Sequence, residues 1–367
     1  MGKAMAFMVH NLGLGDVMCF APLFLIAMKQ GYKVDVVFTT GSPQKVAQLI
    51  FPREMRKGDL RLIQPEQALS EKARYDVAVL GDRRSLGAVM KMGKGRLGMV
   101  LPQPFHARRR KEIFLYNWGA RPLLRLSGIR SGHMVPNQGE AVGASVFGIF
   151  CDAIGKKASY PDEAEEVRER MRSSIKAGRG KGGKTILVHL FRDLDYKKIE
   201  NAKLDIIAEC LSKQFPGYQV ITLLDAKSPW EKEHAEHFSA SCISHGMRCS
   251  LLSPTLEEAG RLAFSASLYL GVDHGISHLA SMFCPRSIIL YGGSARQMGV
   301  HALWPPQIAG RRTEISKNIS RIQGNGRMAV LLHPSDDEYF SNPKNDSVLI
   351  NRIITRESVE TVLDLVK

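Results

Sequence analysis

The sequence lacks any CxxC pair and any long apolar run, and aromatic residues make up only 7% of the chain. Without a CxxC pair, its six cysteines indicate neither a zinc ribbon nor a redox dithiol motif. We expect reduced, mostly buried thiols. The spacing of Cys242, His245 and Cys249 comes nearest to a metal pattern but matches no standard zinc module. The cysteines therefore predict no metal site.

Two further absences concern membranes and export. The longest apolar stretch, Val17 to Met28, has about 12 residues and contains Pro22, whereas a membrane-spanning helix needs roughly 20. The chain does not open with the basic, apolar and small-residue segments of a secretory signal. These features predict a cytoplasmic protein that can still visit a membrane surface through its charge.

The length and composition of the chain predict a globular protein of two domains. At roughly 150 residues per domain, 367 residues correspond to two comparable domains. Hydrophobic residues make up 44% of the chain, enough for a sizeable core. The 51 Lys and Arg residues outnumber the 36 Asp and Glu residues, and the formal net charge is +15. This charge favours an anionic partner, such as nucleic acid, a phosphorylated substrate or an acidic membrane surface.

Most of the positive excess lies between Arg83 and Arg130, where twelve Lys and Arg residues accompany the single acid Glu112. The densest run is Arg108, Arg109, Arg110 and Lys111. Basic residues outnumber what solubility requires, so we expect this stretch to face an anion, with a solvated surface as the alternative. Because no RNP signature or zinc finger is present, nucleic acid is not the expected partner.

Short β-type runs alternate with helix-length segments in two series. The first series is Ala4–Val9, Val34–Phe38, Leu60–Ile63 and Asp76–Leu80, and the second is Thr185–Leu190, Gln219–Leu224, Arg248–Leu252, Leu268–Val272 and Ser287–Tyr291. Strands that alternate with helices are typical of βαβ units. The sequence therefore predicts an α/β fold with a parallel sheet in each half.

The domain boundary is predicted between the two series. A charged helical stretch, Asp162–Lys176, is followed there by the exposed connector Gly178–Lys184. This divides the chain into domains 1–178 and 179–350. In the last segment, 351–367, we expect Thr355 to cap a terminal helix that packs back on the N-terminal domain.

Two short motifs conflict with their context or occur too easily by chance. Gly178–Thr185 matches the phosphate-binding pattern GxxxxGK[ST], which must follow a strand and open a helix. Here a charged helix precedes the pattern and an apolar strand follows it, so we do not expect an NTPase. Asp193 and Asp195 match the DxD spacing of metal-dependent sugar transferases, with an ordinary exposed loop as the alternative.

The segment Asn11–Pro22 is more specific, because it follows the first predicted strand directly. Its glycines allow the backbone to approach a ligand closely, and Asp16 stands at the start of the next helix. A cap on that helix is the alternative role for this carboxylate.

A second polar segment follows the strand Leu268–Val272. Asp273, His274 and Gly275 come directly after this strand, and the next helix carries Ser277 and His278. Open α/β sheets bind ligands at the carboxyl ends of their parallel strands. A buried structural histidine would explain His278 alone, but it explains the whole cluster poorly.

These segments resemble glycosyltransferase family nine, the bacterial ADP-heptose:lipopolysaccharide heptosyltransferases. Gly15-Asp16 followed by Pro22 is similar to the amino-terminal signature of the family. Asp273–Ala280, together with the downstream Ile289–Ser294, resembles its Asp-Thr-Gly-x-x-His-Leu segment and the Phe/Tyr-Gly-Pro-Thr that follows. Ile354–Val362 is similar to its terminal helix.

The resemblance implies a fold and a reaction. The fold is α/β, with two Rossmann-like domains that face each other across a cleft (GT-B type). The first domain would bind mainly the acceptor and the second mainly a nucleotide-sugar donor. The reaction would be an inverting transfer that needs neither a metal nor another cofactor.

The resemblance also implies residue roles. Asp16 would be the general base, Asp273 and Gly275 would contact the donor sugar and phosphate, and His278 would approach the diphosphate. The expected donor-binding set is Arg192, Lys197 or Lys198, Glu231 at the nucleotide ribose, Asp273, His274, Gly275 and His278. The expected acceptor-binding set is Arg108, Arg109, Arg110 and Lys111.

The chain departs from the family pattern in several places. Phe191–Asp195 stands where the family has small residues that admit the diphosphate, and the tryptophan after the lysine is absent. His274 replaces the usual threonine and Gly293 replaces a proline. The cysteine-held iron motif of the protein-modifying branch is also missing.

The resulting hypothesis is a cytoplasmic glycosyltransferase that works at or near the inner membrane. It would move heptose or a related sugar, with ADP-heptose as the favoured donor, onto an acidic glycan such as the lipopolysaccharide inner core. One alternative is a diverged glycan- or nucleotide-binding protein of the same fold without catalysis. Another is a transferase that acts on a protein acceptor.

Overall fold

The computed structural model describes residues 3–72, 75–80, 97–100, 129–131, 147, 151, 156–175, 183–191, 198–291, 313–316, 321–324, 328–332 and 346–367. The chain divides into two compact units, Met1–Ser174 and Ile175–Lys367. The sequence predicts this division after residue 178, in the connector that follows the charged helix.

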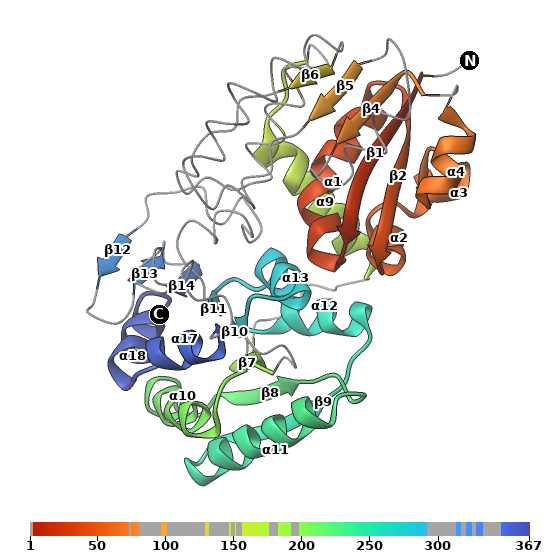
Figure 1. The fold of residues 1–367 in the computed structure, drawn as a ribbon. Helices are drawn as coiled ribbons and strands as arrows, with labels where there is room; N and C mark the ends of the chain where they lie inside the picture. Colours follow the sequence, from red (N-terminus) through yellow and green to blue (C-terminus); the bar gives the residue numbers. More distant parts are fainter. Residues whose placement is uncertain are drawn as a thin grey trace. The chain divides into compact units, whose positions relative to one another are not determined.

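The first unit is built on a sheet with the strand order β3-β2-β1-β4-β5-β6 (Figure 1). Its strands are β1 (Lys3–Leu12), β2 (Tyr32–Gly41), β3 (Leu60–Ile63), β4 (Val77–Leu80), β5 (Leu97–Val100) and β6 (Ile129–Ser131). Each neighbouring pair in this order runs parallel. The prediction of a parallel α/β sheet is therefore confirmed for this half of the chain.

The helices of the first unit lie against this sheet and against each other. They are α1 (Leu14–Lys29), α2 (Gln44–Ile50), α3 (Pro52–Lys57), α4 (Pro65–Ser70) and α9 (Tyr160–Ser174). Phe7 of β1 contacts Phe20 and Phe24 of α1, with ring centroids 5.1 and 5.2 Å apart. Phe20 and Phe24 are four residues apart, so they share one face of the helix. This aromatic cluster fixes α1 on the sheet.

A buried carboxylate joins β2 to β3. Asp35 and Arg61 are directly paired in the register of the two strands, and the Arg61 guanidinium donates two hydrogen bonds of 2.7 and 2.6 Å to the Asp35 carboxylate. The Tyr75 hydroxyl donates a third, at 2.7 Å. Burial and this carboxylate raise the pKa of the Tyr75 phenol. Asp35 is fully buried, so these donors replace the water that its charge has lost.

The second unit contains a sheet with the order β12-β13-β14-β11-β10-β7-β8-β9. Its strands are β7 (Thr185–His189), β8 (Gln219–Leu223), β9 (Arg248–Leu252), β10 (Leu268–Val272), β11 (Ser287–Leu290), β12 (Thr313–Ser316), β13 (Arg321–Gly324) and β14 (Met328–Leu332). The strands from β14 to β9 in this order are parallel. β12 and β13 add an antiparallel extension at one side.

Thr185 opens β7 and not a helix. The GxxxxGK[ST] pattern that ends at this residue therefore leads into a strand, in agreement with the rejection of an NTPase site.

Helices cover both faces of the second sheet. They are α10 (Asn201–Gln214), α11 (Pro229–Ser244), α12 (Leu256–Ser265), α13 (Gly275–Phe283), α17 (Asp346–Ile353) and α18 (Arg356–Asp364). Figure 1 shows α12 and α13 on one side of the sheet and α10, α11 and α18 on the other. Among the described residues, no helix combines the length and the apolar character that a membrane crossing requires.

The terminal helix packs into the core of the second unit. Thr355 does cap α18, since its hydroxyl accepts a hydrogen bond of 3.2 Å from the Ser358 amide. Val359, Val362 and Leu363 are buried in the core of the second unit, together with residues of α10 and of the sheet. The amphipathic pattern of the sequence identifies the buried face of this helix, but not the sheet that buries it.

We expect the Arg61→Met substitution to destabilise the first unit by about 3 kcal/mol, because it leaves the buried Asp35 carboxylate without its guanidinium. Arg168→Met is the matched control, since it removes an ion pair with Glu165 whose carboxylate is 47% exposed. The control should cost less than about 1 kcal/mol. Urea unfolding measures the free energy of unfolding of both variants. Equal decreases would show that the Asp35–Arg61 pair contributes no more than an exposed ion pair.

Candidate functional site

Each sheet has one point where its strand order reverses. In the first sheet the chain runs from β1 outward to β3 and then returns to β4, on the other side of β1. In the second it runs from β7 to β9 and returns to β10, on the other side of β7. The loops that leave the strands at such a point diverge, and the crevice between them is where open α/β sheets bind ligands.

Asp16 lies in the first turn of α1, at the first of these points. β1 ends at Leu12, and α1 begins at Leu14. The Asp16 carboxylate accepts a hydrogen bond of 2.8 Å from the backbone amide of Gly13. The side chain is neither fully buried nor fully exposed. Asp16 therefore does cap its helix, and its partial exposure leaves it within reach of a small molecule.

Close backbone contact shapes the carboxyl end of β1. Gly41, at the end of β2, pairs with Leu12 and has a φ of +119°. A Cβ at this position would lie 2.2 Å from the Leu12 carbonyl oxygen. Only glycine fits both the backbone conformation and the space. The path of the chain just before Asp16 therefore depends on this glycine.

The Asp273–His278 segment lies at the second reversal point. Asp273 and His278 are 8% and 6% exposed. His274 is the N-cap of α13, and its Nδ1 accepts a hydrogen bond of 3.3 Å from the Ile276 amide. In a neutral imidazole this places the ring proton on Nε2, which can then donate to a ligand. Gly275 follows as the first residue of α13.

Hydroxyl groups hold the start of α13 against β10. The Tyr269 and Ser277 hydroxyls are 2.8 Å apart, and Ser277 also donates to the Val272 carbonyl. Gly271 leaves room for the tyrosine, since a Cβ there would lie 2.1 Å from the Tyr269 hydroxyl oxygen. These contacts are buried and join strand to helix, so they fix where the N-terminus of α13 points.

His189 joins this cluster from the neighbouring strand, and the sequence reasoning did not single it out. It is the last residue of β7, is 5% exposed, and pairs with Gly271 across the β7–β10 ladder. Its ring centroid lies 5.0 Å from that of His274. A histidine at the end of an otherwise apolar strand next to a predicted ligand edge was a signal that could have identified it.

Glu231 lies in the first turn of α11 and is 2% exposed. Its Oε2 accepts a hydrogen bond of 3.1 Å from the Asp225 amide, and the Ser228 hydroxyl caps the helix by accepting one of 3.3 Å from the Glu231 amide. In the described structure, this carboxylate thus closes the loop after β8. The carboxyl end of β8 next to β7 is the edge where a nucleotide of a donor would lie.

Lys198 belongs to the loop between β7 and α10. Its Nζ lies 5.4 Å from the ring centroid of Trp230, which in turn stacks on His234 at 4.0 Å. The buried Asn351 of α17 holds this loop, because its amide donates to the Lys198 carbonyl at 3.0 Å and accepts from the Glu200 amide at 2.9 Å. The backbone at Lys198 is therefore fixed, while its cation rests on an aromatic surface.

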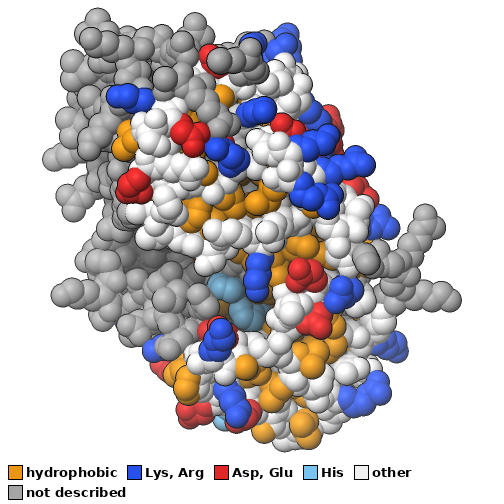
Figure 2. Space-filling view, turned by 90° about the vertical axis from the view of Figure 1, so that its right-hand side faces the viewer, with side chains coloured by type: hydrophobic (Ala, Val, Ile, Leu, Met, Phe, Trp, Pro, Cys, Tyr) orange, Lys and Arg blue, Asp and Glu red, His pale blue; other side chains and the backbone are white. Residues whose placement is uncertain are grey.

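Several predicted site residues lie outside the described residues. They are Arg192, Lys197, Arg108, Arg109, Arg110 and Lys111, with Asp193 and Asp195 of the DxD pattern. On the face drawn in Figure 2, the described basic side chains lie among acidic ones and do not form a continuous positive surface. The predicted anion-facing surface of the first domain thus stays a prediction. Among the described residues, no cluster of three or more His, Cys, Asp or Glu side chains could hold a metal ion.

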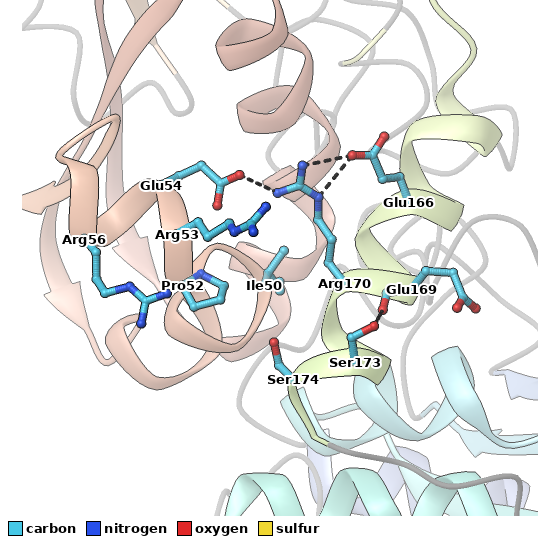
Figure 3. A pocket seen from close by; sticks show the side chains of 10 residues that line it. All are labelled: Ile50, Pro52, Arg53, Glu54, Arg56, Glu166, Glu169, Arg170, Ser173 and Ser174. Atoms are coloured by element: carbon cyan, nitrogen blue, oxygen red, sulfur yellow. Dashed lines mark hydrogen bonds and ion pairs between the residues drawn. The ribbon is translucent and has the colours of Figure 1, made fainter.

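A pocket of about 530 Å³ lies in the first unit between the α2–α3 corner and α9 (Figure 3). Its lining includes Arg53, Arg56 and three glutamates. Arg170 bridges two of these acids, at 2.6 Å from Glu54 and 2.9 Å from Glu166. Helices line this pocket and the ends of strands do not, so it belongs to neither reversal point. The sequence analysis placed no residue of the candidate site here.

Comparison with solved structures places this fold in a known class. The E. coli heptosyltransferase WaaC with ADP matches with a TM-score of 0.58 at 16% identity, over 98% of this chain and 99% of that chain. The glycosyl transferase family 9 structure from Veillonella parvula matches with a TM-score of 0.56 at 12% identity, over 99% and 96%. At such identities the likeness concerns the fold, which is of the GT-B type. A comparison with curated protein sequences gives no match.

A family model also matches part of the sequence. Residues 145–318 match the family model of glycosyltransferase family 9 (heptosyltransferase). This region begins before α9 and runs through the Asp273–His278 segment to the end of β12. The matched region covers just under half of the chain, and the match confirms the resemblance stated from its motifs.

We expect Gly41→Ala to destabilise the first unit by more than the about 1–2 kcal/mol that a left-handed backbone conformation costs an alanine, because the new methyl group meets the Leu12 carbonyl. Gly31→Ala is the control, since Gly31 has a φ of +79° but nothing within 4 Å of an added Cβ. Urea unfolding of the two variants separates strain from collision. If both lose the same stability, the contact at Leu12 is not limiting.

Proposed function

We propose that this protein is an inverting glycosyltransferase that moves heptose or a related sugar from a nucleotide-sugar donor, with ADP-heptose favoured, to an acidic glycan such as the lipopolysaccharide inner core. One observation carries the proposal. Asp16 and the Asp273–His278 segment each occupy the reversal point of a parallel sheet, where this fold binds ligands. The match of residues 145–318 to glycosyltransferase family 9 supports the class of reaction.

In this proposal Asp16 is the general base. The acceptor hydroxyl gives its proton to the carboxylate as its oxygen bonds to the anomeric carbon, and the bond from that carbon to the nucleoside diphosphate breaks. Proton removal by a positioned carboxylate contributes about 10²- to 10⁴-fold to the rate. The hydrogen bond from the Gly13 amide holds one carboxylate oxygen in place, so the side chain is oriented before substrate arrives.

The second domain would bind the donor and stabilise the leaving group. The first turn of α13 begins at Gly275, and a helix N-terminus favours an anion through its free amides and its dipole. His278 and the Nε2 of His274 would donate to the diphosphate, and Asp273 would contact the sugar. Glu231 would accept hydrogen bonds from the ribose. These donors are fixed in the fold before charge develops on the phosphate, which is the condition for electrostatic catalysis.

The acceptor would be bound by the basic stretch of the first domain. The charge of the Arg83–Arg130 stretch favours a phosphorylated or carboxylated glycan, bound by Arg108, Arg109, Arg110 and Lys111. A lipid-linked acceptor of this kind would bring the protein to an anionic membrane surface. A protein acceptor, or binding without catalysis, are the alternatives that activity assays distinguish.

We expect Asp16→Asn to lower the rate of sugar transfer by about 10²- to 10⁴-fold, while ADP binding stays unchanged. Asparagine keeps the oxygen that accepts from Gly13, so the helix cap should survive. The measurement is ADP release from ADP-heptose in the presence of inner-core lipopolysaccharide. Asp76→Asn is the control, because Asp76 accepts a hydrogen bond of 2.9 Å from the Ala4 amide at the opposite end of β1. A folded Asp16→Asn enzyme with the wild-type rate would disprove the base assignment.

We expect ADP-sugars to raise the melting temperature more than UDP- or GDP-sugars at equal concentration, since ligand binding stabilises the folded state by mass action.

Loss of a hydrogen bond to a charged group costs about 1.5–3 kcal/mol, so His278→Ala should weaken ADP binding roughly 10- to 150-fold in calorimetry. His237→Ala serves as the control, because His237 pairs with Asp205 at 2.9 Å between α11 and α10. Equal affinity in all three proteins would remove His278 from the donor site.

A further inference from the structure

A pair of thiols lies between the end of α11 and the edge strand β9. Cys242, near the end of α11, is fully buried, and Cys249 of β9 is partly exposed. Their sulfur atoms are within hydrogen-bonding contact. The Thr222 hydroxyl of β8 also contacts the Cys249 sulfur, at 3.5 Å. Neither residue belongs to the candidate transferase site.

The turn between α11 and β9 brings the two cysteines together. The Gly246 amide donates to the Ile243 carbonyl at 2.9 Å, and the Met247 amide donates to the Cys242 carbonyl at 3.0 Å. These are the two bonds of a Schellman motif, in which Gly246 takes the left-handed conformation with a φ of +83°. The chain therefore reverses at a defined point, and β9 returns beneath the last turn of α11. Six residues separate the two cysteines in the sequence, so the pair is not a CxxC motif.

The surroundings of Cys249 favour its thiolate. The hydrogen bond from Cys242 lowers the pKa of the Cys249 thiol to about 6. Burial opposes this shift, and contacts with the Thr222 hydroxyl and the Ser250 amide support it. Cys210 and Cys284 behave in the opposite way, because burial raises their pKa to about 11 and about 12. One thiol of the pair is thus reactive, and its neighbour can donate a proton to it.

We propose that Cys242 and Cys249 form a redox-active dithiol that hydrogen peroxide converts to an intrachain disulfide. A partly exposed thiolate beside a second thiol is the arrangement of a peroxide-sensitive cysteine with its resolving partner. The geometry requires little rearrangement, since the sulfurs are already in contact and must approach to about 2.05 Å.

The chemistry proceeds in two balanced steps. The Cys249 thiolate attacks one oxygen of hydrogen peroxide, which forms a sulfenic acid and releases hydroxide that takes up a proton as water. The Cys242 sulfur then attacks the sulfenic sulfur, loses its proton and displaces a second hydroxide, which leaves as water. Two thiols are oxidised to one disulfide, and one peroxide is reduced to two waters.

The first test treats the reduced full-length protein with stoichiometric hydrogen peroxide. We expect the intact mass to fall by two hydrogens, peptide mapping to find a Cys242–Cys249 cross-link, and dithiothreitol to reverse both changes. A cross-link that involves another cysteine would overturn the proposal. So would accumulation of sulfinic or sulfonic acid at Cys249 without any cross-link.

The second test removes the resolving thiol. In Cys242→Ser the sulfenic acid of Cys249 should persist and be trapped by dimedone, whereas Cys210→Ser should form the disulfide as the wild type does. Trapping in the wild type at the level of Cys242→Ser would exclude Cys242 as the resolving residue.

A third test uses the wild-type protein, so its result does not depend on whether a variant folds. Alkylation of Cys249 by iodoacetamide should reach half its maximal rate near pH 6, well below the roughly 8.5 of an ordinary thiol. At pH 7 the thiolate fraction would then be roughly thirtyfold that of an ordinary cysteine. A midpoint at or above pH 8 would overturn the proposal.

Discussion

In each domain the first strand of the sheet pairs in parallel with a strand on either side, and both domains depend on this constraint. β1 pairs with β2 and β4, and β7 pairs with β8 and β10. A parallel connection must cross from one end of the sheet to the other, usually through a helix. The chain therefore leaves each central strand on one side and returns on the other, and the two loops that part there form the polar edge of the sheet. We expect the chemistry at these edges, because the topology leaves backbone amides and side chains there that the sheet itself does not pair.

The polar edge of the second domain is held by contacts that have no chemical role of their own. The buried Tyr269 and Ser277 hydroxyls bind helix to strand, and Gly271 exists as glycine because the tyrosine ring occupies the space of a side chain. These residues determine where the amides of the first α13 turn point. The first domain has a similar arrangement. Gly41 leaves room for the Leu12 carbonyl, and Asp16 accepts a hydrogen bond from Gly13 just after it.

The sequence predicted the two parallel sheets well, because buried strands such as Thr185–Leu190 are short apolar runs bounded by turn residues. It did not predict β5, β6 or the three strands β12, β13 and β14 at the side of the second sheet, whose short segments carry no clear alternation. Asp16 and the Asp273–His278 segment could be found because they follow predicted strands directly. His189 left a signal of the same kind, because it ends an apolar strand. Trp230 left none, since its contact with Lys198 depends on which loops and helices are neighbours in space. For the same reason, the apolar face of the terminal helix predicts that this helix is buried, but not which elements bury it.

The Asn351 side chain links two parts of the chain that the sequence holds far apart. Its amide replaces water at both the Lys198 carbonyl and the Glu200 amide, so the loop after β7 is braced by α17. α17 is thereby a structural support for the loop between β7 and α10. Truncating or tagging the carboxyl terminus would first increase the mobility of the loop after β7, before it destabilised the sheet.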